Sequence, residues 1–479
     1  MILKNSLSKS SVCWCVGILA LCVAVNYLVG AFTMVFGADE REHMHASFMV
    51  LSGLVPYRDF FEHHHPLFWY LLQPFIYFFG DNPSVWVYAR GVVVLLNGGI
   101  AYFIYKICRQ AGLSLNGALV AAVSWFAFFA VQKSGTELRP DLLMILFYLA
   151  GLYSFFLYLQ QKRYGWLLLS FVLFFCSFLT LQKVIFLFAG QFFIILRQLF
   201  KKRILLFDFV LACGSVLVLC LLAVWVLYQA GALEVYFRLN WLFNLHIRVM
   251  PMVEIKHLYI FIAGAVCGGG ILFCSKNEIM RDVAFLYLFI GGVLLVWRPW
   301  FYHYLLPYCA LLAIIFGYVV YEPLFKLKWA PFVMLVLACF FAKQAYDKWR
   351  LSLNNAFRLS VYHNVLAFML EKTGPKDLVL GNGEDMVATL RHSALGYYWF
   401  SVGSLATLDN RMFSKKELPD YDLIIKARKP KAVVNGFWRN CALGDMYIAN
   451  RDCPFWEGID RDYLNQHYTD YGFVFIRKD

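Results

Sequence analysis

Apolar stretches long enough to cross a membrane recur along most of the chain. A helix that crosses a hydrocarbon layer of about 30 Å needs roughly 20 apolar residues. Stretches of this kind lie near residues 12–34, 84–106, 115–132, 141–160, 165–182, 184–200, 204–229, 257–274, 283–297, 303–321 and 329–346. The pattern predicts a polytopic α-helical membrane protein whose transmembrane part, residues 1–346, has about eleven spanning helices. No small-residue cleavage site follows the first stretch, which favours an uncleaved membrane helix over a signal peptide.

The pattern changes from about residue 347. Short apolar runs bounded by turn residues predict strands near residues 377–381, 421–426, 431–435 and 471–477. Residues 358–372 and 384–395 have the periodicity of helices. We therefore expect residues 347–479 to form a small α/β domain outside the membrane.

The composition supports this division. Hydrophobic residues make up 61% of the chain and charged residues 15%, and the mean hydropathy is +0.62. A soluble protein has about a quarter of its residues charged. The net charge of +13 does not indicate a nucleic-acid partner, because the basic residues are dispersed between apolar stretches instead of forming one basic face.

Charged residues alternate between the connections that join the apolar stretches. Alternate short connections are basic and contain Lys106, Arg109, Lys162, Arg163, Arg197, Lys201, Lys202, Arg203, Lys276, Arg281, Lys326 and Lys328. Basic loops face the cytoplasm. This rule predicts a cytoplasmic N-terminus, and an odd number of spans places the C-terminal domain on the outer face.

The first outer loop, residues 35–83, holds the densest set of ionisable and aromatic residues. It reads Gly37-Ala-Asp-Glu-Arg-Glu-His-Met-His and then Gly53-Leu-Val-Pro-Tyr-Arg-Asp-Phe-Phe-Glu-His-His-His-Pro-Leu-Phe-Trp-Tyr. Asp39 and His43 share one face if this segment is helical. Ionisable groups at a membrane boundary are costly unless they pair or face water, so the cluster predicts a functional site and not merely a helix end.

This loop resembles the first periplasmic loop of GT-C glycosyltransferases, in particular the bacterial relatives of protein O-mannosyltransferases and of the lipid A aminoarabinose transferase. The resemblance rests on the Asp39-Glu40 pair, the Gly-x-x-Pro-Tyr-x-Asp-Phe-x-Glu-His pattern and the following Pro-Leu. It implies a multi-pass protein of the bacterial inner membrane with a periplasmic C-terminal domain. It further implies a polyprenyl-phosphate-linked sugar donor and an envelope glycan, lipid or protein as acceptor.

The resemblance also implies roles for single residues. Asp39 is expected to be the general base of an inverting transfer or the carboxylate that orients the acceptor, and Arg139, within Thr136-Glu-Leu-Arg-Pro-Asp141, is expected to contact the donor phosphate. A guanidinium suits a phosphate through its paired donors. The other residues expected to bind substrate are Glu40, His43, Arg58, Asp59, Glu62, His64, Asp141, Arg298 and His303. Arg58, Lys183, Arg298 and His303 are weaker candidates, because a structural ion pair or a position at the membrane interface would also explain each of them, Lys183 most of all. For Asp141, simple pairing with Arg139 is the alternative.

A divalent metal ion is a second expectation for this loop. Some members of the family bind one, and His63-His64-His65 with Glu62 and Asp59 offers suitable donor atoms. Adjacent histidines do not readily bind one ion together, and no spaced ligand motif is present. We name His63 and Glu62 as candidate ligands and leave open a site without metal. The lipid A branch has Lys-Pro-Pro-Leu where this chain has His64-His-Pro-Leu67, so a cation at His64 depends on protonation.

Cys441 and Cys453 fall within the expected outer domain. An oxidising compartment favours their pairing, and we expect a disulfide there, with two free thiols as the alternative.

Two other functions fit a polytopic protein. A transporter or flippase of a lipid-linked sugar would place charges in mid-membrane and interrupt helices in both halves of the chain. An O-antigen ligase or polymerase would concentrate its functional residues in a large late loop. The charges here concentrate in the first loop, which favours the glycosyltransferase.

Overall fold

The computed structural model describes residues 2–34, 37–246, 259–297, 301–324, 327, 329–381, 390–398, 420–434, 459–472 and 474–478. The chain divides into two compact units, each built from separated parts of the sequence. Unit 1 comprises Met1–Val35, Ala89–Ala223 and Arg248–Phe357, and unit 2 comprises Phe36–Tyr88, Val224–Ile247 and Arg358–Asp479. Arg298, Cys441 and Cys453 lie outside the described residues, so their expected roles stay predictions.

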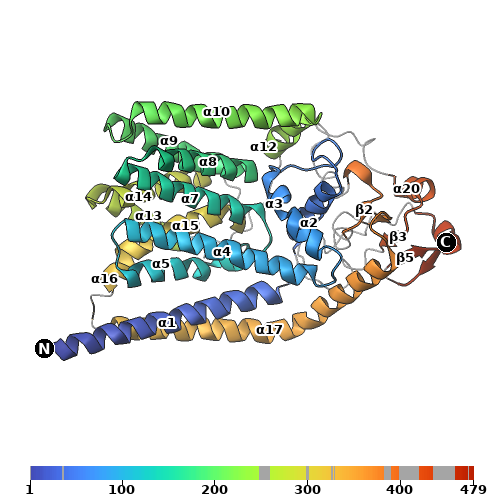
Figure 1. Cartoon of the computed structure of the whole chain (residues 1–479). Coiled ribbons are helices and arrows are strands. Elements are labelled where there is room, and N and C mark those ends of the chain that lie inside the picture. Colours follow the sequence, from blue (N-terminus) through green and yellow to red (C-terminus); the bar gives the residue numbers. More distant parts are fainter. Residues whose placement is uncertain are drawn as a thin grey trace. The chain divides into compact units, whose positions relative to one another are not determined.

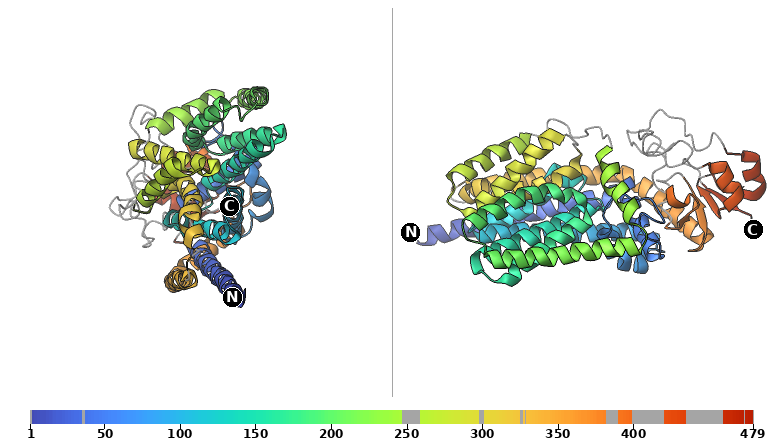
Figure 2. Two further views of the ribbon diagram at one scale, coloured as in Figure 1. Left: turned by 90° about the vertical axis from the view of Figure 1, so that its left-hand side faces the viewer. Right: turned by 90° about the horizontal axis from the view of Figure 1, so that it is seen from above.

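Unit 1 is a bundle of apolar helices that run roughly alongside one another (Figures 1 and 2). Its helices are α1 (Ile2–Thr33), α5 (Leu115–Ala127), α6 (Phe129–Lys133), α7 (Pro140–Gln161), α8 (Tyr164–Thr180), η1 (Gln182–Val184), α9 (Ile185–Phe200), α13 (Tyr259–Cys274), α14 (Glu278–Trp297), η4 (Tyr302–Leu305), α15 (Leu306–Phe316), η5 (Gly317–Tyr321) and α16 (Glu322–Leu324). Most of α4 (Val85–Gln110) and α10 (Leu206–Gln229) and the first part of α17 (Ala330–Lys372) also belong to it.

The described residues contain eight helices that are long and apolar enough to cross a membrane. They match eight of the eleven expected stretches. The other three expected stretches correspond to the shorter apolar helices Leu115–Ala127, Tyr164–Thr180 and Tyr259–Cys274. The chain is therefore a polytopic, multi-pass α-helical membrane protein, as the hydropathy pattern predicts.

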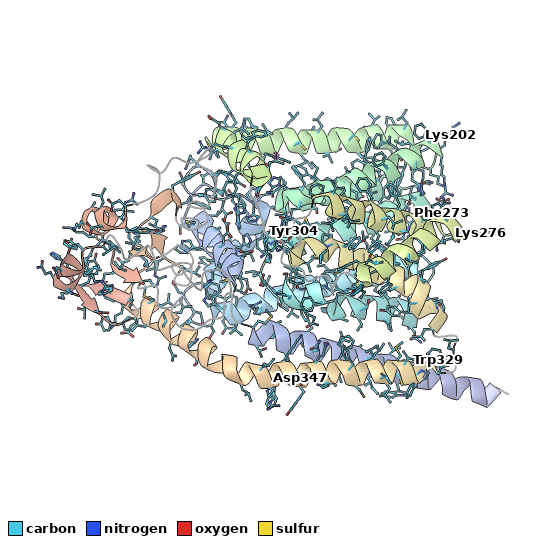
Figure 3. All side chains as sticks on the ribbon, turned by 180° about the vertical axis from the view of Figure 1, so that it is seen from behind. Lys202, Phe273, Lys276, Tyr304, Trp329 and Asp347 are labelled. Carbon is cyan, nitrogen blue, oxygen red and sulfur yellow. The ribbon has the colours of Figure 1, made fainter. Side chains whose placement is uncertain are left out.

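Basic connections from distant parts of unit 1 lie at one end of its bundle. Lys202 and Lys276 lie at the same end as Trp329, and Tyr304 lies toward the other end (Figure 3). This separation agrees with the alternation of charged connections in the sequence.

Small residues allow close helix packing within unit 1. A Cβ added at Gly151 of α7 would lie 2.7 Å from Cδ1 of Phe174 on α8. Glycine at this contact lets the two backbones approach, which is how membrane helices commonly associate. We attribute the close α7–α8 pairing to Gly151.

Unit 2 combines the first outer loop, the C-terminal region and part of a later connection, within Val224–Ile247. The charge pattern predicts that this connection is also outside, and we call it the second outer segment. The loop contributes α2 (Ala38–Leu51) and α3 (Leu67–Phe79), and the second segment contributes α11 (Leu233–Phe237), η2 (Arg238–Phe243, a π-helix) and α12 (Asn244–His246). The C-terminal region has a five-stranded sheet of β1 (Leu378–Leu380), β2 (His392–Ser393), β3 (Ala432–Val434), β4 (Tyr468–Asp470) and β5 (Val474–Arg477), and the helices α20 (Tyr421–Arg428) and α22 (Arg461–His467).

The sheet has the strand order β2-β1-β3-β5-β4. Strand β1 pairs in parallel with β2 and β3, whereas β5 pairs antiparallel with β3 and β4. The small α/β region expected at the C-terminus is therefore present. The strands expected near residues 377–381, 431–435 and 471–477 are confirmed as β1, β3 and β5.

Two local predictions in this region were wrong. Residues 421–428 form helix α20 and not a strand, because the Asp420 side chain accepts a hydrogen bond from the Leu423 amide at 3.0 Å and caps the helix. Lys426 and Arg428 lie in the last turn of α20, where positive charge stabilises a helix. Within the range 384–395, where a helix was expected, the described residues contain strand β2.

Helix α17 runs without a break from Ala330 to Lys372. It contains the helix expected at 358–372, and the domain boundary expected at residue 347 falls inside it.

Candidate functional site

Helix α2 carries the acids of the first outer loop. Its first turn contains Asp39 and Glu40, and negative charge is favoured at a helix N-terminus. The buried Glu40 accepts a hydrogen bond from the Gly37 amide at Oε2, at 3.0 Å. Glu40 thus caps the helix, while Asp39 is partly exposed to solvent.

His43 lies one turn after Asp39 on α2 and is completely buried. Trp69 of α3 donates a hydrogen bond from Nε1 to Nδ1 of His43 at 3.3 Å, and Ser47 donates from Oγ to the Trp69 carbonyl at 2.7 Å. The His43 ring also lies 5.0 Å from the His64 ring. These contacts fix α2 against α3 and place His43 beside the histidine run.

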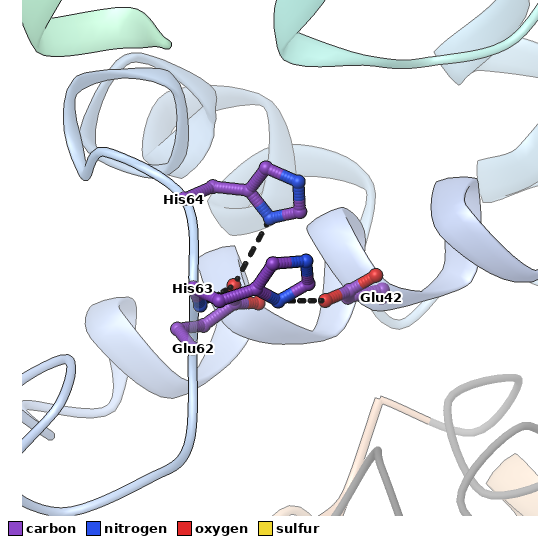
Figure 4. Close-up of side chains that lie close together, drawn as sticks. All are labelled: Glu42, Glu62, His63 and His64. Atoms are coloured by element: carbon purple, nitrogen blue, oxygen red, sulfur yellow. Dashed lines mark hydrogen bonds and ion pairs between the residues drawn. The ribbon is translucent and has the colours of Figure 1, made fainter. Parts of the chain in front are cut away.

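Two acids and two histidines converge near His43, and we call them the acid–histidine cluster: Glu42, Glu62, His63 and His64 (Figure 4). One ligand atom from each residue lies within 4.8 Å of every other. Nδ1 of His64 lies 3.4 Å from Oε2 of Glu62, and Nδ1 of His63 lies 3.9 Å from Oε1 of Glu42. Residues from α2 and from the following loop therefore face one small space.

The electrostatics of the cluster centre on Glu62, which is completely buried. Burial raises the pKa of this carboxyl group to about 8, although hydrogen bonds from the His63 backbone and with Glu42 oppose the shift. Two neighbouring carboxyl groups retain a proton between them unless a cation compensates their charge. The cluster is therefore suited to bind either a proton or a metal cation.

The donor set fits a divalent transition metal. Carboxylate oxygens and imidazole nitrogens together suit zinc or manganese. The sequence named His63 and Glu62 as candidate ligands, and the geometry adds Glu42 and His64. A bound ion would supply positive charge to the loop, and these four residues would hold it.

Arg58 and Asp59 form a separate pair in the loop. Arg58 donates from Nε and Nη2 to the two oxygens of Asp59, each at 2.8 Å, and from Nη1 to the Ala230 carbonyl at 3.0 Å. The Arg58 hydrogen bonds lower the pKa of the Asp59 carboxyl group. The 47% exposed Arg58 side chain is accessible to an anion, while Asp59 accepts from the Val55 amide and stabilises the turn.

A second group of the expected residues lies in unit 1. Asp141, in the first turn of α7, accepts from Nε of Arg139 at 3.3 Å and from Nζ of Lys183 at 3.4 Å. The Lys183 ammonium also lies 4.1 Å from the centre of the Tyr304 ring. The partly exposed His303 is within electrostatic reach of Arg139 and Lys183. This unit thus gathers Arg139, Asp141, Lys183 and His303.

The sequence reasoning missed residues that hold these groups. In unit 1 it omitted Glu137, which lies 3.4 Å from Nη1 of Arg139. In unit 2 it gave no role to Tyr236 and Asn244 of the second outer segment. Tyr236, Asn240 and Asn244 follow one another at intervals of four residues. In a helix this spacing places the three polar side chains on one face, and this pattern could have identified Tyr236 and Asn244 from the sequence.

Comparison with known proteins gives a family match and a fold match. Residues 63–228 match the family model described as dolichyl-phosphate-mannose-protein mannosyltransferase. The structure of ArnT from Cupriavidus metallidurans bound to undecaprenyl phosphate is 13% identical, covers 92% of this chain and 96% of its own, and superposes with a TM-score of 0.60. The apo structure of that protein is 13% identical, covers 79% and 84%, and gives a TM-score of 0.56. No curated protein sequence matches this chain.

These findings confirm the resemblance stated from the first outer loop. The chain has the fold of the GT-C glycosyltransferases, and less than half of it carries the sequence signature of a glycosyltransferase family. The family match begins at His63 and includes Arg139, Asp141 and Lys183, whereas Asp39 precedes it.

Proposed function

We propose that this chain transfers a sugar from a polyprenyl-phosphate donor to an envelope glycan, lipid or protein. The reaction takes place at the periplasmic face of a bacterial inner membrane and inverts the anomeric carbon. Asp39 is the base, and Arg139 contacts the donor phosphate. The GT-C fold and the family match to residues 63–228 support this class of reaction, and the similar ArnT structure holds undecaprenyl phosphate.

The assignment of Asp39 as the base rests on one observation: of the four acids on and near α2, three are buried and only Asp39 is partly exposed. Glu40, Glu42 and Glu62 are 1%, 2% and 0% exposed. An acceptor hydroxyl can deliver its proton only to a carboxylate that it reaches. Asp39 therefore suits the base, while the buried acids suit capping and charge balance.

The proposed reaction is a single displacement. The Asp39 carboxylate takes the proton of the acceptor hydroxyl as its oxygen bonds to the anomeric carbon. The bond from that carbon to the phosphate oxygen breaks, and polyprenyl phosphate leaves with the electron pair. Charge that develops on the phosphate is stabilised by cations fixed in advance.

Arg139 suits the role of phosphate ligand by its chemistry and its contacts. Its guanidinium lies 3.3 Å from an oxygen of Asp141 and 3.4 Å from an oxygen of Glu137. Both distances are longer than those of the tightest charge-assisted hydrogen bonds, about 2.7–2.9 Å. Lys183 offers a second cation on the same Asp141 carboxylate.

The test is transfer by the purified full chain with a panel of polyprenyl-phosphate sugars. Asp39→Asn should lower the rate by roughly 100- to 10,000-fold, the usual contribution of a positioned base, with donor binding retained. Asp347→Asn is the matched control, because Asp347 is half-exposed and pairs only with the exposed Lys343 among the interactions described. Full activity of Asp39→Asn would disprove the assignment of the base.

A further inference from the structure

Each of the three consecutive histidines is held by a different residue of unit 2. Asn244 donates from Nδ2 to the carbonyl of His63 at 2.8 Å, and Tyr57 donates from its hydroxyl to the carbonyl of His64 at 2.6 Å. The Tyr236 hydroxyl lies 2.9 Å from Nε2 of His65. The first two hydrogen bonds go to main-chain carbonyls of the acid–histidine cluster, so they fix the orientation of the peptide groups of His63 and His64.

We propose that Tyr57 and Asn244 are positioning residues for the transfer reaction: by fixing the carbonyls of His63 and His64 they aim both imidazoles at the buried carboxylates of Glu42 and Glu62. This inference rests on the proposed function. It extends the site to the second outer segment, 181 positions away in the sequence.

Tyr57 is held in a conformation that only a fixed surrounding maintains. Its φ of +70° lies in the left-handed region, which a bulky side chain rarely adopts. The side chain is completely buried, its amide donates to the Phe60 carbonyl at 3.0 Å, and its ring meets the Tyr236 ring edge-on at 5.3 Å. Strained residues of this kind concentrate at functional sites, and here the strain directs a hydroxyl onto the His64 carbonyl.

Asn244 follows the π-helix η2, and its amide connects two segments. Nδ2 donates to the His63 carbonyl and also lies 3.0 Å from the Asn240 carbonyl within its own segment. The preceding Phe243 packs against Phe61 and His63, with ring centres 5.3 Å away in both cases. π-helical turns are frequent at functional sites, and this one places Asn244 against the histidine run.

The His63 peptide groups are thus fixed on both sides. The His63 amide donates to Oε2 of Glu62 at 3.1 Å, and the His63 carbonyl accepts from Asn244. Loss of the Asn244 donor would allow the two peptide planes to rotate, and the imidazole would move with them. The carboxyl group of Glu62 interacts electrostatically with the proposed base Asp39, and a displacement of about 1 Å around a reacting group can lower its rate roughly 100-fold.

The experiment measures kcat and the donor KM of Tyr57→Phe, Asn244→Asp and the double variant. Tyr57→Phe removes one hydroxyl donor, and Asn244→Asp replaces the donating amide by a carboxylate of nearly the same shape that accepts but does not donate. We expect kcat to fall by roughly 10- to 100-fold with a donor KM within about twofold of the wild type. The double variant should lose less than the product of the two single effects, because both act on the same turn.

Matched controls separate positioning from general stability. Tyr468→Phe removes a buried hydroxyl that donates to the Pro430 carbonyl at 3.0 Å, and Asn277→Asp removes an amide donor to the Ala111 carbonyl at 2.6 Å. Both should retain the wild-type kcat, whatever their midpoint of thermal unfolding. If Asn244→Asp does not fold, Tyr57→Phe carries the test alone, since it lacks only one oxygen atom.

The outcomes are distinct. A wild-type chain that transfers no sugar from any donor overturns the proposed function and this inference with it. An active wild type whose two variants keep its kcat overturns this inference alone. A fall in kcat that the two controls share would also overturn it.

Discussion

The ammonium group of Lys183 lies 3.4 Å from Oδ1 of Asp141, although the two residues belong to different helical segments, η1 and α7. Arg139 approaches the other oxygen of the same carboxylate. One acid therefore aligns two cations, and it holds the Lys183 side chain against the Tyr304 ring. This arrangement gives a specific expectation for donor binding.

We predict that Arg139→Ala raises the donor KM by roughly 10- to 100-fold, because a hydrogen bond to a charged group contributes about 1.5–3 kcal/mol. Lys183→Met should raise the KM by a smaller factor, because a point charge lacks the paired donors of a guanidinium. The measurement is the donor dependence of the transfer rate. Arg203→Ala is the control, since Arg203 is 46% exposed and pairs with Glu278. An unchanged donor KM in Arg139→Ala would remove Arg139 from the phosphate site.

The acid–histidine cluster should bind one divalent transition-metal ion. Addition of Zn²⁺ or Mn²⁺ to the metal-free full chain at neutral pH should give binding near one ion per chain and a higher midpoint of thermal unfolding, because the ion binds the folded state. Calorimetric titration measures both the affinity and the stoichiometry.

Glu62→Gln and His63→Ala should each lower this metal affinity by at least about tenfold, since each removes one donor atom. His467→Phe, a change in the C-terminal region, should leave it unchanged. Equal affinity in the wild type and in Glu62→Gln would show that the ion binds elsewhere, and the cluster would then be a proton site.

The stability of the protein should fall in mild acid because of His45. Burial, and to a smaller degree the neighbouring His392, lowers the pKa of His45 to about 3. The unfolded chain, with a histidine pKa near 6.5, binds more protons than the folded chain between these values. Stability is therefore fully present above pH ~6.5 and is lost as the pH falls toward 3, at up to about 1.4 kcal/mol per pH unit.

The measurement is the midpoint of thermal unfolding between pH 7.5 and 5. His45→Phe should flatten this dependence, since the replacement keeps a buried ring near Phe48 and cannot bind a proton. His467→Phe should keep the wild-type slope. A wild-type slope in His45→Phe would mean that other groups cause the loss.

The sequence by itself determined the class of fold and the region of the candidate site. The apolar stretches predicted the membrane helices because crossing a hydrocarbon layer imposes a length and a composition on each segment separately. The density of acids and histidines after the first stretch identified the loop for the same reason, since both signals are local in the chain.

The local signal was weaker in the C-terminal region. Residues 421–428 contain an apolar run that is compatible with a strand or a helix, and the N-terminal cap at Asp420 stabilises the helix. Short apolar segments remain ambiguous in this way until their neighbours are known.

Only the tertiary structure decided which side chains converge. Glu42 joins Glu62, His63 and His64 because α2 packs against the loop before α3, and Asn244 reaches His63 from a segment that no local pattern connects to it. Lys183 meets Asp141 across 42 positions. These contacts depend on how distant segments pack together, and no local pattern in the sequence shows that packing.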